Sequence, residues 1–399
     1  MTNVAILGFG VVGSGVAKLI TDNKNEVSKL GGDDINIKYI LDLRDFPSSP
    51  FADKVIHDFD TILNDPEIDT VMEVMGGSHP AYEYTMALLK AGKNVITSNK
   101  EVVANFGDEF LLTAKERGVS YRFEAAVGGG IPVLSPIINC IGQNKVLEVR
   151  GILNGTTNYI LTEMFTKGKS FASALSDAQE KGYAERNPDA DVLGTDACRK
   201  IAILTALVSG KLIPTDSIHT EGIVNIRESD VAAAEAFGCT IKLVGRGIVG
   251  EDKPLALVSP FLIPKEMPLS QVAGVYNAVE VIAEPLGNVM FYGQGAGAGA
   301  TASAVVGDLM QVMCSGTHCH APVFTKFADV IDSAALTSCF YLAFDKNDRE
   351  KVSAVFEGAK TVENGTEIAV LTAAMSGREL LEKLSANSLS PLSRIRCIF

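Results

Sequence analysis

The sequence predicts an α/β fold built on a doubly wound parallel sheet, and three observations support this. Short apolar strands alternate with amphipathic helices through the first third of the chain. A glycine-rich turn joins the first strand to the first helix. The chain has 399 residues, of which 47% are hydrophobic, enough for two or three domains with a large core. Such alternating strands pair in parallel and bind ligands at their carboxyl ends.

The first element is a short buried strand, Val4 to Leu7, which runs into G-F-G-V-V-G. Gly8 permits a tight turn, Gly10 lets the backbone approach a pyrophosphate, and Gly13 lets the following helix pack closely on the strand. The free N–H groups and the positive dipole end of that helix then face the phosphates. With a strand before it and a helix after it, the motif predicts a Rossmann-type dinucleotide site.

The second strand, I-K-Y-I-L-D-L-R-D, ends in charged residues that bear on cofactor choice. Asp42 falls where an acid binds the ribose 2′-hydroxyl of NAD. Arg44, two residues later, is placed to receive the 2′-phosphate of NADP instead. Both residues also fit solvated charges at a strand end, so the sequence leaves NAD and NADP open.

Further strands are expected at 70–76, 94–100 and 119–132, with a helix at 81–92 that ends at Gly92. The carboxyl-end rule for parallel sheets places the polar residues after the strand at 94–100 beside the cofactor. These are Thr97, Ser98, Asn99 and Lys100. For Lys100, a surface lysine in a helix-starting turn is an equally good interpretation.

Composition excludes several classes of partner and location. The net charge of −13 argues against a nucleic-acid or anionic-membrane partner, because no basic stripe is present to neutralise phosphates. No apolar run reaches the roughly 18 to 20 residues that span a bilayer. Strand-like sequence begins at Val4, so we expect no signal peptide. Seven cysteines without a C-x-x-C pair predict reduced thiols in a cytoplasmic protein.

The stretch G-Y-A-E-R-N-P-D-A-D-V-L-G-T-D-A-C-R-K, residues 182–200, concentrates opposite charges before an apolar helix. A helix that starts near Thr195 places Asp196 and Lys200 on one face. An ordinary ion pair at this spacing contributes only a few tenths of a kcal/mol and explains the pair equally well. Glu185 in the preceding loop favours a site, because loop and helix carboxylates together can bind an ammonium group. The expected apolar stripe beside the pair is Ala197, Ile201, Leu204 and Val208.

Other polar residues are better explained without a site. Asp189 and Asp191 fit turn chemistry around Pro188. The segment M-C-S-G-T-H-C-H-A-P, residues 313–322, holds possible soft-metal ligands whose spacing matches no standard zinc pattern. A helix end with polarisable side chains is the favoured interpretation of these residues, Cys314, His318, Cys319 and His320.

Taken together, several segments in order resemble the homoserine dehydrogenase family, over at least residues 1–325. The first are the G-F-G-V-V-G turn, G-G-S-H-P-A-Y-E-Y-T-M-A-L-L-K-A-G-K-N-V-I-T-S-N-K and E-A-A-V-G-G-G-I-P. Next come G-I-L-N-G-T-T-N-Y-I-L and the 182–200 stretch with its apolar continuation. The last, G-Q-G-A-G-A-G-A-T-A-S-A-V-V-G-D-L, has Ala300 where proline is usual in the family.

The resemblance implies reversible reduction of L-aspartate 4-semialdehyde to L-homoserine by NADPH or NADH, on the route to threonine and methionine. By position, Lys200 is the proton donor and Lys100 the second catalytic lysine. A cationic lysine stabilises the alkoxide that forms as hydride arrives. Glu185, Asp196 and Thr156 bind the substrate. The cofactor-binding positions are Gly8, Phe9, Gly10, Val11, Val12, Gly13, Thr97, Ser98, Lys100, Gly182 and Gly297.

The resemblance also implies a bound cation and an assembly. A sodium-type ion would bind the backbone carbonyls of Glu124, Val127, Gly129 and Ile131, and a glycine-rich turn of carbonyls suits a hard cation. The expected domains are a dinucleotide-binding domain (1–134, completed by 292–330) and a substrate and dimerisation domain (135–291). A homodimer or a dimer of dimers is expected.

After Lys326 the resemblance weakens. Residues 331–399 fit a short, degenerate module of the ACT type that many family members carry. The tail lacks the Asp-x-Pro-Gly turn of an effector site and has D-K-N-D-R-E at 345–350 instead. We therefore expect a small α/β tail without strong threonine binding.

Two alternatives from the residues were weighed. Aspartate-semialdehyde dehydrogenase chemistry needs a cysteine nucleophile with a histidine base, and Cys140 and Cys198 have no evident histidine partner. A regulator that binds NAD(P) without turnover could lose Lys200, Asp196 or Glu185, yet all three are present.

Overall fold

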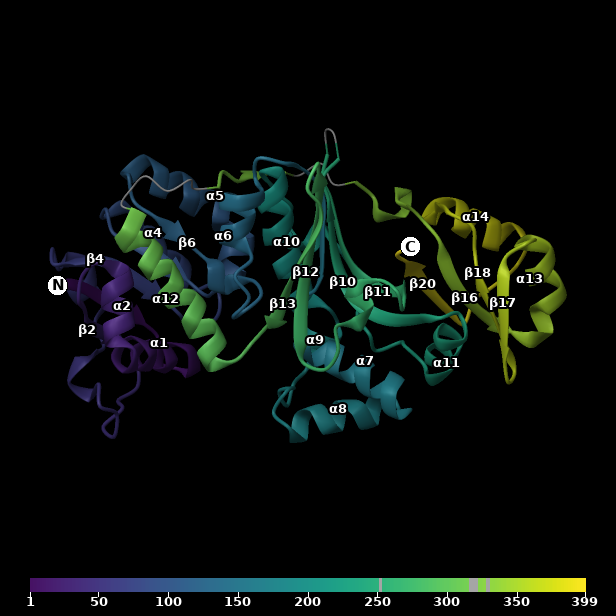
Figure 1. The fold of residues 1–399 in the computed structure, drawn as a ribbon, viewed down its shortest axis with the longest axis horizontal. Helices are drawn as coiled ribbons and strands as arrows, with labels where there is room; N and C mark the ends of the chain where they lie inside the picture. The colour runs from purple at the N-terminus through teal and green to yellow at the C-terminus, as the bar shows by residue number, and fades with distance from the viewer. Residues whose placement is uncertain (251–252, 316–321, 328–330) are drawn as a thin grey trace. The chain divides into compact units, whose positions relative to one another are not determined.

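The computed structural model describes residues 1–250, 253–315, 322–327 and 331–399 (Figure 1). The chain divides into two compact units, each assembled from three segments. Unit 1 comprises Met1–Lys145, Ala202–Thr215 and Gly293–Phe327. Unit 2 comprises Val146–Ile201, Asp216–Tyr292 and Ala328–Phe399.

Unit 1 contains the predicted parallel sheet, which confirms the fold class. Its strand order is β3-β2-β1-β4-β5-β6, and each pair is parallel. The order reverses beside β1, which is the switch point where doubly wound sheets bind ligands. The strands are β1 (Thr2–Leu7), β2 (Ile35–Leu41), β3 (Val55–Ile56), β4 (Ile68–Glu73), β5 (Asn94–Thr97) and β6 (Tyr121–Arg122).

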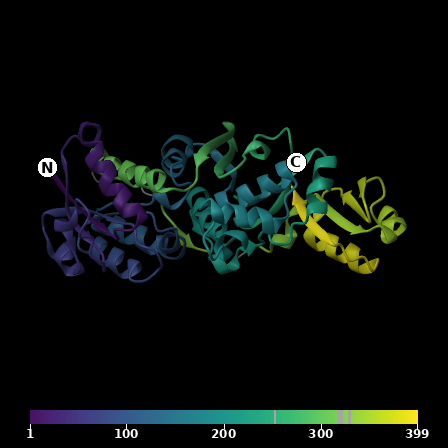
Figure 2. The same cartoon turned by 90° about the horizontal axis from the view of Figure 1, so that it is seen from below.

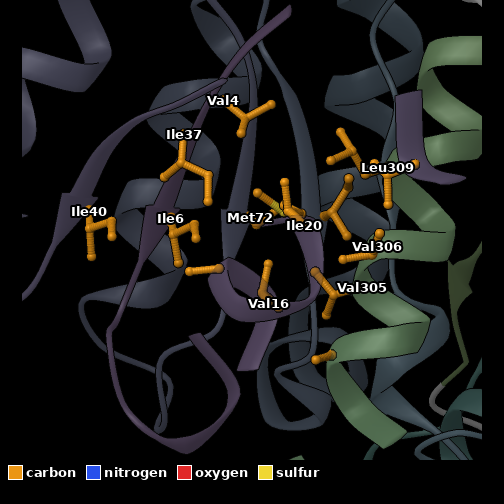
Figure 3. Close-up of a cluster of buried hydrophobic side chains, with 14 of the residues drawn as sticks. Val4, Ile6, Val16, Ile20, Ile37, Ile40, Met72, Val305, Val306 and Leu309 are labelled. Carbon is orange, nitrogen blue, oxygen red and sulfur yellow. The ribbon is translucent and has the colours of Figure 1, made fainter. Parts of the chain in front are cut away.

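Helices cover this sheet, and one of them returns from far along the chain. Helix α12 (Ala298–Ser315) lies against α1 (Val11–Asp22) and α2 (Lys24–Gly31), as Figures 1 and 2 both show. Figure 3 shows Val305, Val306 and Leu309 of α12 pointing into the same apolar cluster as side chains of β1, β2 and α1. The return segment expected near 292–330 therefore supplies part of the core of unit 1. The other helices of unit 1 include α3 (Phe59–Asn64), α4 (Ala81–Lys90), α5 (Lys100–Arg117) and α6 (Leu134–Pro136).

Unit 2 is built on a larger mixed sheet with the order β13-β12-β7-β10-β11-β20-β16-β18-β17. β10 and β11 pair antiparallel over ten residues each, and the strands of this part are largely buried. The strands are β7 (Lys145–Ile152), β10 (Cys239–Ile248), β11 (Leu255–Pro264), β12 (Tyr276–Glu284) and β13 (Gly287–Gln294). The helices include α7 (Gly155–Lys167), α8 (Phe171–Glu180), α9 (Asp189–Val192) and α11 (Glu228–Ala236). Helix α10 (Thr195–Ser209) belongs to unit 2 up to Ile201 and to unit 1 from Ala202.

The C-terminal residues form a β-α-β-β-α-β arrangement whose sheet continues that of unit 2. Its strand order, fourth-first-third-second, is that of a split β-α-β fold. β20 pairs in parallel with β11, through Leu262 and Cys397 among others. The elements are β16 (Phe340–Asp345), α13 (Arg349–Val355), β17 (Lys360–Asn364), β18 (Glu367–Leu371), α14 (Gly377–Ala386) and β20 (Ser393–Cys397). The division into three domains stays a prediction.

Most elements lie where the periodicity predicted them. α10 begins at Thr195, and the residues Ala197, Ile201 and Leu204 of its expected stripe are buried. The segment 119–132 differs: only Tyr121–Arg122 pair as a strand, and a short 3-10 turn follows at Glu124–Ala126. Among the helices of the described residues, none combines the length and apolar character needed to cross a bilayer.

Candidate active site

The cofactor turn, Gly8 to Gly13, has the geometry that its glycines predicted. Gly8 adopts a positive φ of 95°, which an L side chain rarely tolerates. A Cβ on Gly13 would stand 2.0 Å from the carbonyl oxygen of Gly8, whereas a Cβ on Gly10 would meet nothing within 4 Å. Gly10 is the N-cap of α1, so the backbone here is open to a ligand at a helix N-terminus. The turn therefore fits a pyrophosphate.

The charges at the end of β2 are engaged with each other. Arg44 donates from Nε to Asp42 Oδ1 at 3.0 Å and from its terminal nitrogen to Oδ2 at 3.2 Å. Phe9 N–H donates to Asp42 Oδ2 at 2.8 Å. These bonds, led by that from Arg44, lower the pKa of Asp42 to about 2. The Arg44 side chain is 65% exposed and its guanidinium lies 5.1 Å from the Phe46 ring, so it remains accessible to a ligand.

The polar residues after β5 serve partly to hold the strand ends together. Thr97 Oγ1 donates to Glu73 Oε2 at 2.5 Å, and Met75 N–H donates to Glu73 Oε1 at 2.8 Å. Burial raises the pKa of Glu73 to about 7. Asn99 caps α5 through its side-chain oxygen, and Lys100 is the first, half-buried residue of that helix. The hydroxyl of Thr97 is thus engaged inside the protein. Any contact of Thr97 with a cofactor would have to come from its backbone.

The proposed ion ligands lie in a buried turn of unit 1. Glu124 does not offer its carboxylate to an ion: it accepts the backbone N–H groups of Val133, Leu134 and Ser135 at 2.6, 2.9 and 2.7 Å. Its carbonyl accepts the N–H of Val127 at 3.4 Å. In the described part of the chain, no hydrogen bond reaches the remaining carbonyls, which belong to Val127, Gly129 and Ile131. Gly129, with a φ of 56°, turns the chain so that buried carbonyls of this kind fit a hard cation.

A second cluster of polar side chains is centred on Lys200. Its Nζ donates to Asp196 Oδ2 at 2.8 Å, as the i,i+4 spacing predicted, and to the carbonyl of Leu153 at 2.7 Å. Lys200 and Asp196 are both buried. A charged pair in such surroundings costs desolvation unless it is hydrogen-bonded, and two directed bonds fix the position of the lysine nitrogen.

One side chain of this cluster, that of Asn154, was not predicted from the sequence. Asn154 donates from Nδ2 to Asp196 Oδ2 at 3.0 Å and to Asp191 Oδ1 at 2.7 Å. Its side-chain oxygen caps α7 by accepting Thr157 N–H at 2.9 Å. Burial, with the nearby charge of Asp196, raises the pKa of Asp191. The turn interpretation of Asp191 was therefore incomplete, and the N-cap position of Asn154 was the signal available in the sequence.

Thr156 and Glu185 belong to the same side of unit 2. Thr156 Oγ1 donates to the carbonyl of Tyr183 at 2.6 Å. Tyr183 lies two residues before Glu185, in the loop that follows α8. Glu185 is exposed, and its carbonyl accepts Gln179 Nε2 at 3.1 Å. The Thr156–Tyr183 hydrogen bond thus links the loop that carries Glu185 to the start of α7, next to Asn154.

The remaining predicted residues are placed as follows. Gly182 turns the chain after α8 with a φ of 72°, and Gly297, with a φ of 122°, precedes α12. Cys314 is exposed near the end of α12 and donates to the carbonyl of Leu30 at 2.9 Å. His318, Cys319 and His320 lie outside the described residues.

Comparison with known proteins agrees with the motifs. Residues 8–124 match the sequence model of the homoserine dehydrogenase NAD binding domain, and residues 132–310 match that of homoserine dehydrogenase. A homoserine dehydrogenase of Synechocystis sp. is 42% identical over 315 residues, which cover 78% of this chain and 73% of that protein.

Solved structures extend the likeness to the whole chain. A homoserine dehydrogenase of Thiobacillus denitrificans gives a TM-score of 0.90 at 32% identity, covering 100% of this chain and 98% of its own. A hyperthermophilic archaeal homoserine dehydrogenase mutant in complex with NADPH gives 0.67 at 26% identity, covering 79% and 98%. Since relatives that cover most of the sequence agree with its motifs and its fold, the chain belongs to the homoserine dehydrogenase family of NAD(P)-dependent oxidoreductases.

Proposed function

We propose that Lys200 is the group that exchanges a proton with the substrate oxygen. The observation that carries this proposal is the pair of hydrogen bonds that fix its Nζ, to Asp196 Oδ2 and to the Leu153 carbonyl. During reduction the ammonium stabilises the forming alkoxide and donates a proton to it; during oxidation the neutral amine accepts that proton. When bound, the nicotinamide cofactor supplies or accepts the hydride.

The substrate's amino-acid end is proposed to bind the carboxylates and hydroxyl of unit 2. Glu185 and Asp196 offer negative charge to its ammonium group, and Thr156, in the first turn of α7, offers a hydroxyl. Positioning of this kind accounts for much of the rate gain in a hydride transfer. Lys100, at the carboxyl end of β5 in unit 1, is proposed as the second catalytic lysine.

We further propose that NADP is preferred to NAD. Both oxygens of Asp42 already accept hydrogen bonds from Arg44 and from Phe9 N–H, so the acceptor that a ribose 2′-hydroxyl needs is occupied. Arg44 keeps further N–H groups on an exposed guanidinium, which suits a 2′-phosphate. The turn Gly8 to Gly13 is proposed to contact the phosphates, and Gly182 and Gly297 are further cofactor-binding positions proposed from the family resemblance.

A sodium-type ion on the carbonyls of Glu124, Val127, Gly129 and Ile131 belongs to the same proposal. Its support is that the carbonyls of Val127, Gly129 and Ile131 accept no hydrogen bond in the described residues, while that of Glu124 accepts the long, 3.4 Å bond from Val127 N–H. A homodimer in the cytoplasm is proposed from the family resemblance, and the six described cysteines are reduced. None of the relatives reported above is a non-catalytic regulator.

The test is the initial rate of L-homoserine oxidation with NAD and NADP in parallel, followed by the absorbance of the reduced cofactor. The wild type is expected to turn over faster with NADP, and Lys200→Ala to lose about a hundredfold or more while still binding cofactor. Nearly unchanged turnover in Lys200→Ala would contradict the role of Lys200. Equal rates with the two cofactors would contradict the role of Arg44.

A further inference from the structure

The loop that carries Glu185 is anchored to helix α7 at more than one point. We call residues 181–188 the Glu185 loop. It begins at Lys181, the C-cap of α8, and Gly182 turns it back so that Tyr183 N–H reaches the carbonyl of Ala178 at 2.8 Å. The carbonyl of Tyr183 accepts the hydroxyl of Thr156 at 2.6 Å. The first turn of α7 therefore holds the backbone of the loop directly.

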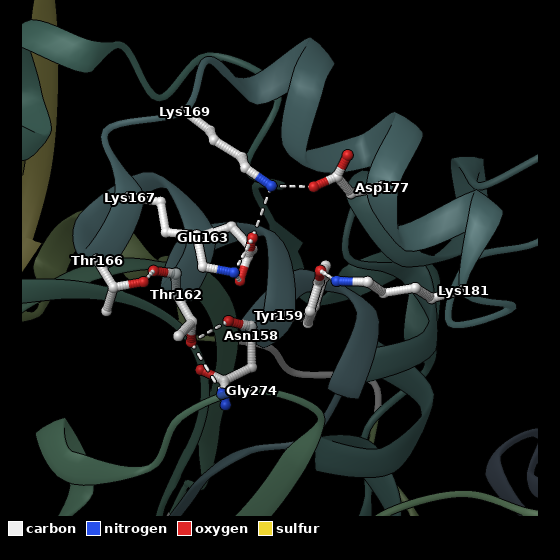
Figure 4. Close-up of polar contacts among 10 residues, drawn as sticks. All are labelled: Asn158, Tyr159, Thr162, Glu163, Thr166, Lys167, Lys169, Asp177, Lys181 and Gly274. Carbon is white, nitrogen blue, oxygen red and sulfur yellow. Dashed lines mark hydrogen bonds and ion pairs between the residues drawn. The ribbon is translucent and has the colours of Figure 1, made fainter.

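A second anchor lies one turn further along α7. The rings of Tyr159 and Tyr183 lie 5.1 Å apart at an angle of 60°. Lys181 Nζ donates to the hydroxyl of Tyr159 at 2.6 Å, the bond drawn as a dashed line in Figure 4. Tyr159 is 6% exposed, so its ring is held by the core of unit 2. The loop is thus attached to one buried tyrosine through both Lys181 and Tyr183.

We propose that Tyr159 and Lys181 are positioning residues that hold the Glu185 loop in the conformation that binds the substrate's ammonium end. This inference rests on the proposed role of Glu185. Neither residue is proposed to touch the substrate. Both restrict a loop that would otherwise lose conformational entropy on binding, and such preorganisation increases affinity.

A neighbouring network on the same two helices provides a matched control. Glu163 of α7 accepts Lys167 and Lys169, each at 2.8 Å, and Lys169 also pairs with Asp177 of α8 (Figure 4). The pairs of Lys169 with Glu163 and Asp177 join α7 to α8, whereas the Lys167–Glu163 pair lies within α7. In the described residues, the side chains of Glu163, Lys167 and Lys169 form no hydrogen bond with residues 181–188. Lys167→Met removes one of these ion pairs and leaves Tyr159, Lys181 and Tyr183 untouched.

The kinetic experiment compares Tyr159→Phe, Lys181→Met, the double variant, Lys181→Arg and Lys167→Met with the wild-type enzyme. The first two variants each remove the same hydrogen bond and are expected to raise KM for homoserine about fivefold, with kcat changed by less than about twofold. The double variant is expected to match the singles, because the two residues act through one bond. Lys181→Arg should restore most of the affinity, and Lys167→Met should leave KM unchanged.

Hydrogen-exchange mass spectrometry of residues 182–186 gives a readout that needs no turnover. Exchange is expected to quicken in Tyr159→Phe and Lys181→Met but not in Lys167→Met. Unchanged exchange in Lys181→Met would overturn the anchoring. Faster exchange with an unchanged homoserine KM would overturn the positioning role. If the wild type failed to oxidise homoserine, the proposed function would be wrong. The exchange rates would still show whether Tyr159 and Lys181 hold the Glu185 loop in place.

Discussion

The cofactor turn, Gly8 to Gly13, and the cluster around Lys200 are built from different chemical groups. The turn consists of backbone: its conformation requires glycine at position 13, where a Cβ would stand 2.0 Å from the Gly8 carbonyl oxygen. The cluster consists of side chains, in which Asn154 holds Asp191 and Asp196 while Lys200 bonds to Asp196. Substitutions that add a side chain should therefore disrupt the turn, whereas substitutions that remove a charge should disrupt the cluster.

The largest expected effect is the loss of charge in the cluster. Lys200→Ala should lower kcat for homoserine oxidation about a hundredfold or more, with the Kd for NADP changed by less than about threefold. Removal of the cation leaves Asp196 buried without its lysine, so some loss of Tm is expected as well. Stopped-flow or steady-state rates and a cofactor titration measure the two quantities. Lys265→Met, which breaks an exposed 3.5 Å pair with Glu235, is the control and should match the wild type.

Added volume in the turn is expected to have the next largest effect, and two glycines separate its causes. Gly13→Ala should lower Tm and weaken NADP binding together, since its methyl group collides with the backbone. Gly10→Ala has room for its methyl group and should keep its Tm, yet it should weaken NADP binding about tenfold or more by blocking the approach of the pyrophosphate. Thermal shift and calorimetric titration distinguish them. A Gly10→Ala variant that binds NADP normally would show that the ligand does not approach this backbone.

A smaller effect is expected at the end of β2, where cofactor selectivity depends on one side chain. Arg44→Ala should lower the ratio of kcat/KM for NADP over that for NAD about tenfold, since a charge-assisted contact to the 2′-phosphate is lost. Asp42 then becomes available to a 2′-hydroxyl, so the NAD rate should rise or hold. Arg349→Ala, at an exposed arginine of the C-terminal region, should leave the ratio unchanged. An unchanged ratio in Arg44→Ala would place selectivity elsewhere.

The smallest effect concerns a buried carboxyl at the strand ends of unit 1. The pKa of Glu73 is raised to about 7 from 4.5, so the folded protein holds a proton that the unfolded chain releases. The stabilisation that comes from this raised pKa is fully present below about pH 4.5, and it is lost as the pH rises to about 7. Glu73→Gln stays neutral at every pH. The Tm of this variant minus that of the wild type should therefore increase by roughly 2–5 °C from pH 5 to pH 8. Thermal melts across that range, with exposed Glu26→Gln as control, test this. A constant Tm difference would mean that Glu73 does not titrate there.

The two regions also differ in how far the sequence could predict them. The turn was predictable because its requirements are local: a strand, three glycines and a helix follow one another within the first twenty residues. The Asp196–Lys200 pair was predictable for the same reason, since both residues belong to one helix. Asn154 was not predicted because it lies 42 positions from Asp196. Helical or strand periodicity predicts only contacts between residues that are close in the chain.

The structure adds side-chain interactions that no local sequence pattern could predict at two of the expected site residues. Thr97 was expected beside the cofactor, but its hydroxyl bonds to Glu73 inside the protein. The ion-ligand prediction for Glu124 concerns its carbonyl and stays a prediction; its carboxylate accepts the backbone N–H groups of residues 133–135. Both interactions join segments that only the folded sheet brings together.

The sequence by itself determined the parallel sheet, the cofactor turn, the helix with its Asp–Lys pair and the family to which the chain belongs. These follow from residues that are close in the chain, where periodicity and spacing dictate geometry. Only the tertiary structure decided which groups surround each charge: the lysine held by Leu153 and Asp196, the arginine held by Asp42, and the loop tyrosine packed on Tyr159. The strength of a charge or a hydrogen bond depends on burial and on partners, and these are properties of the folded chain.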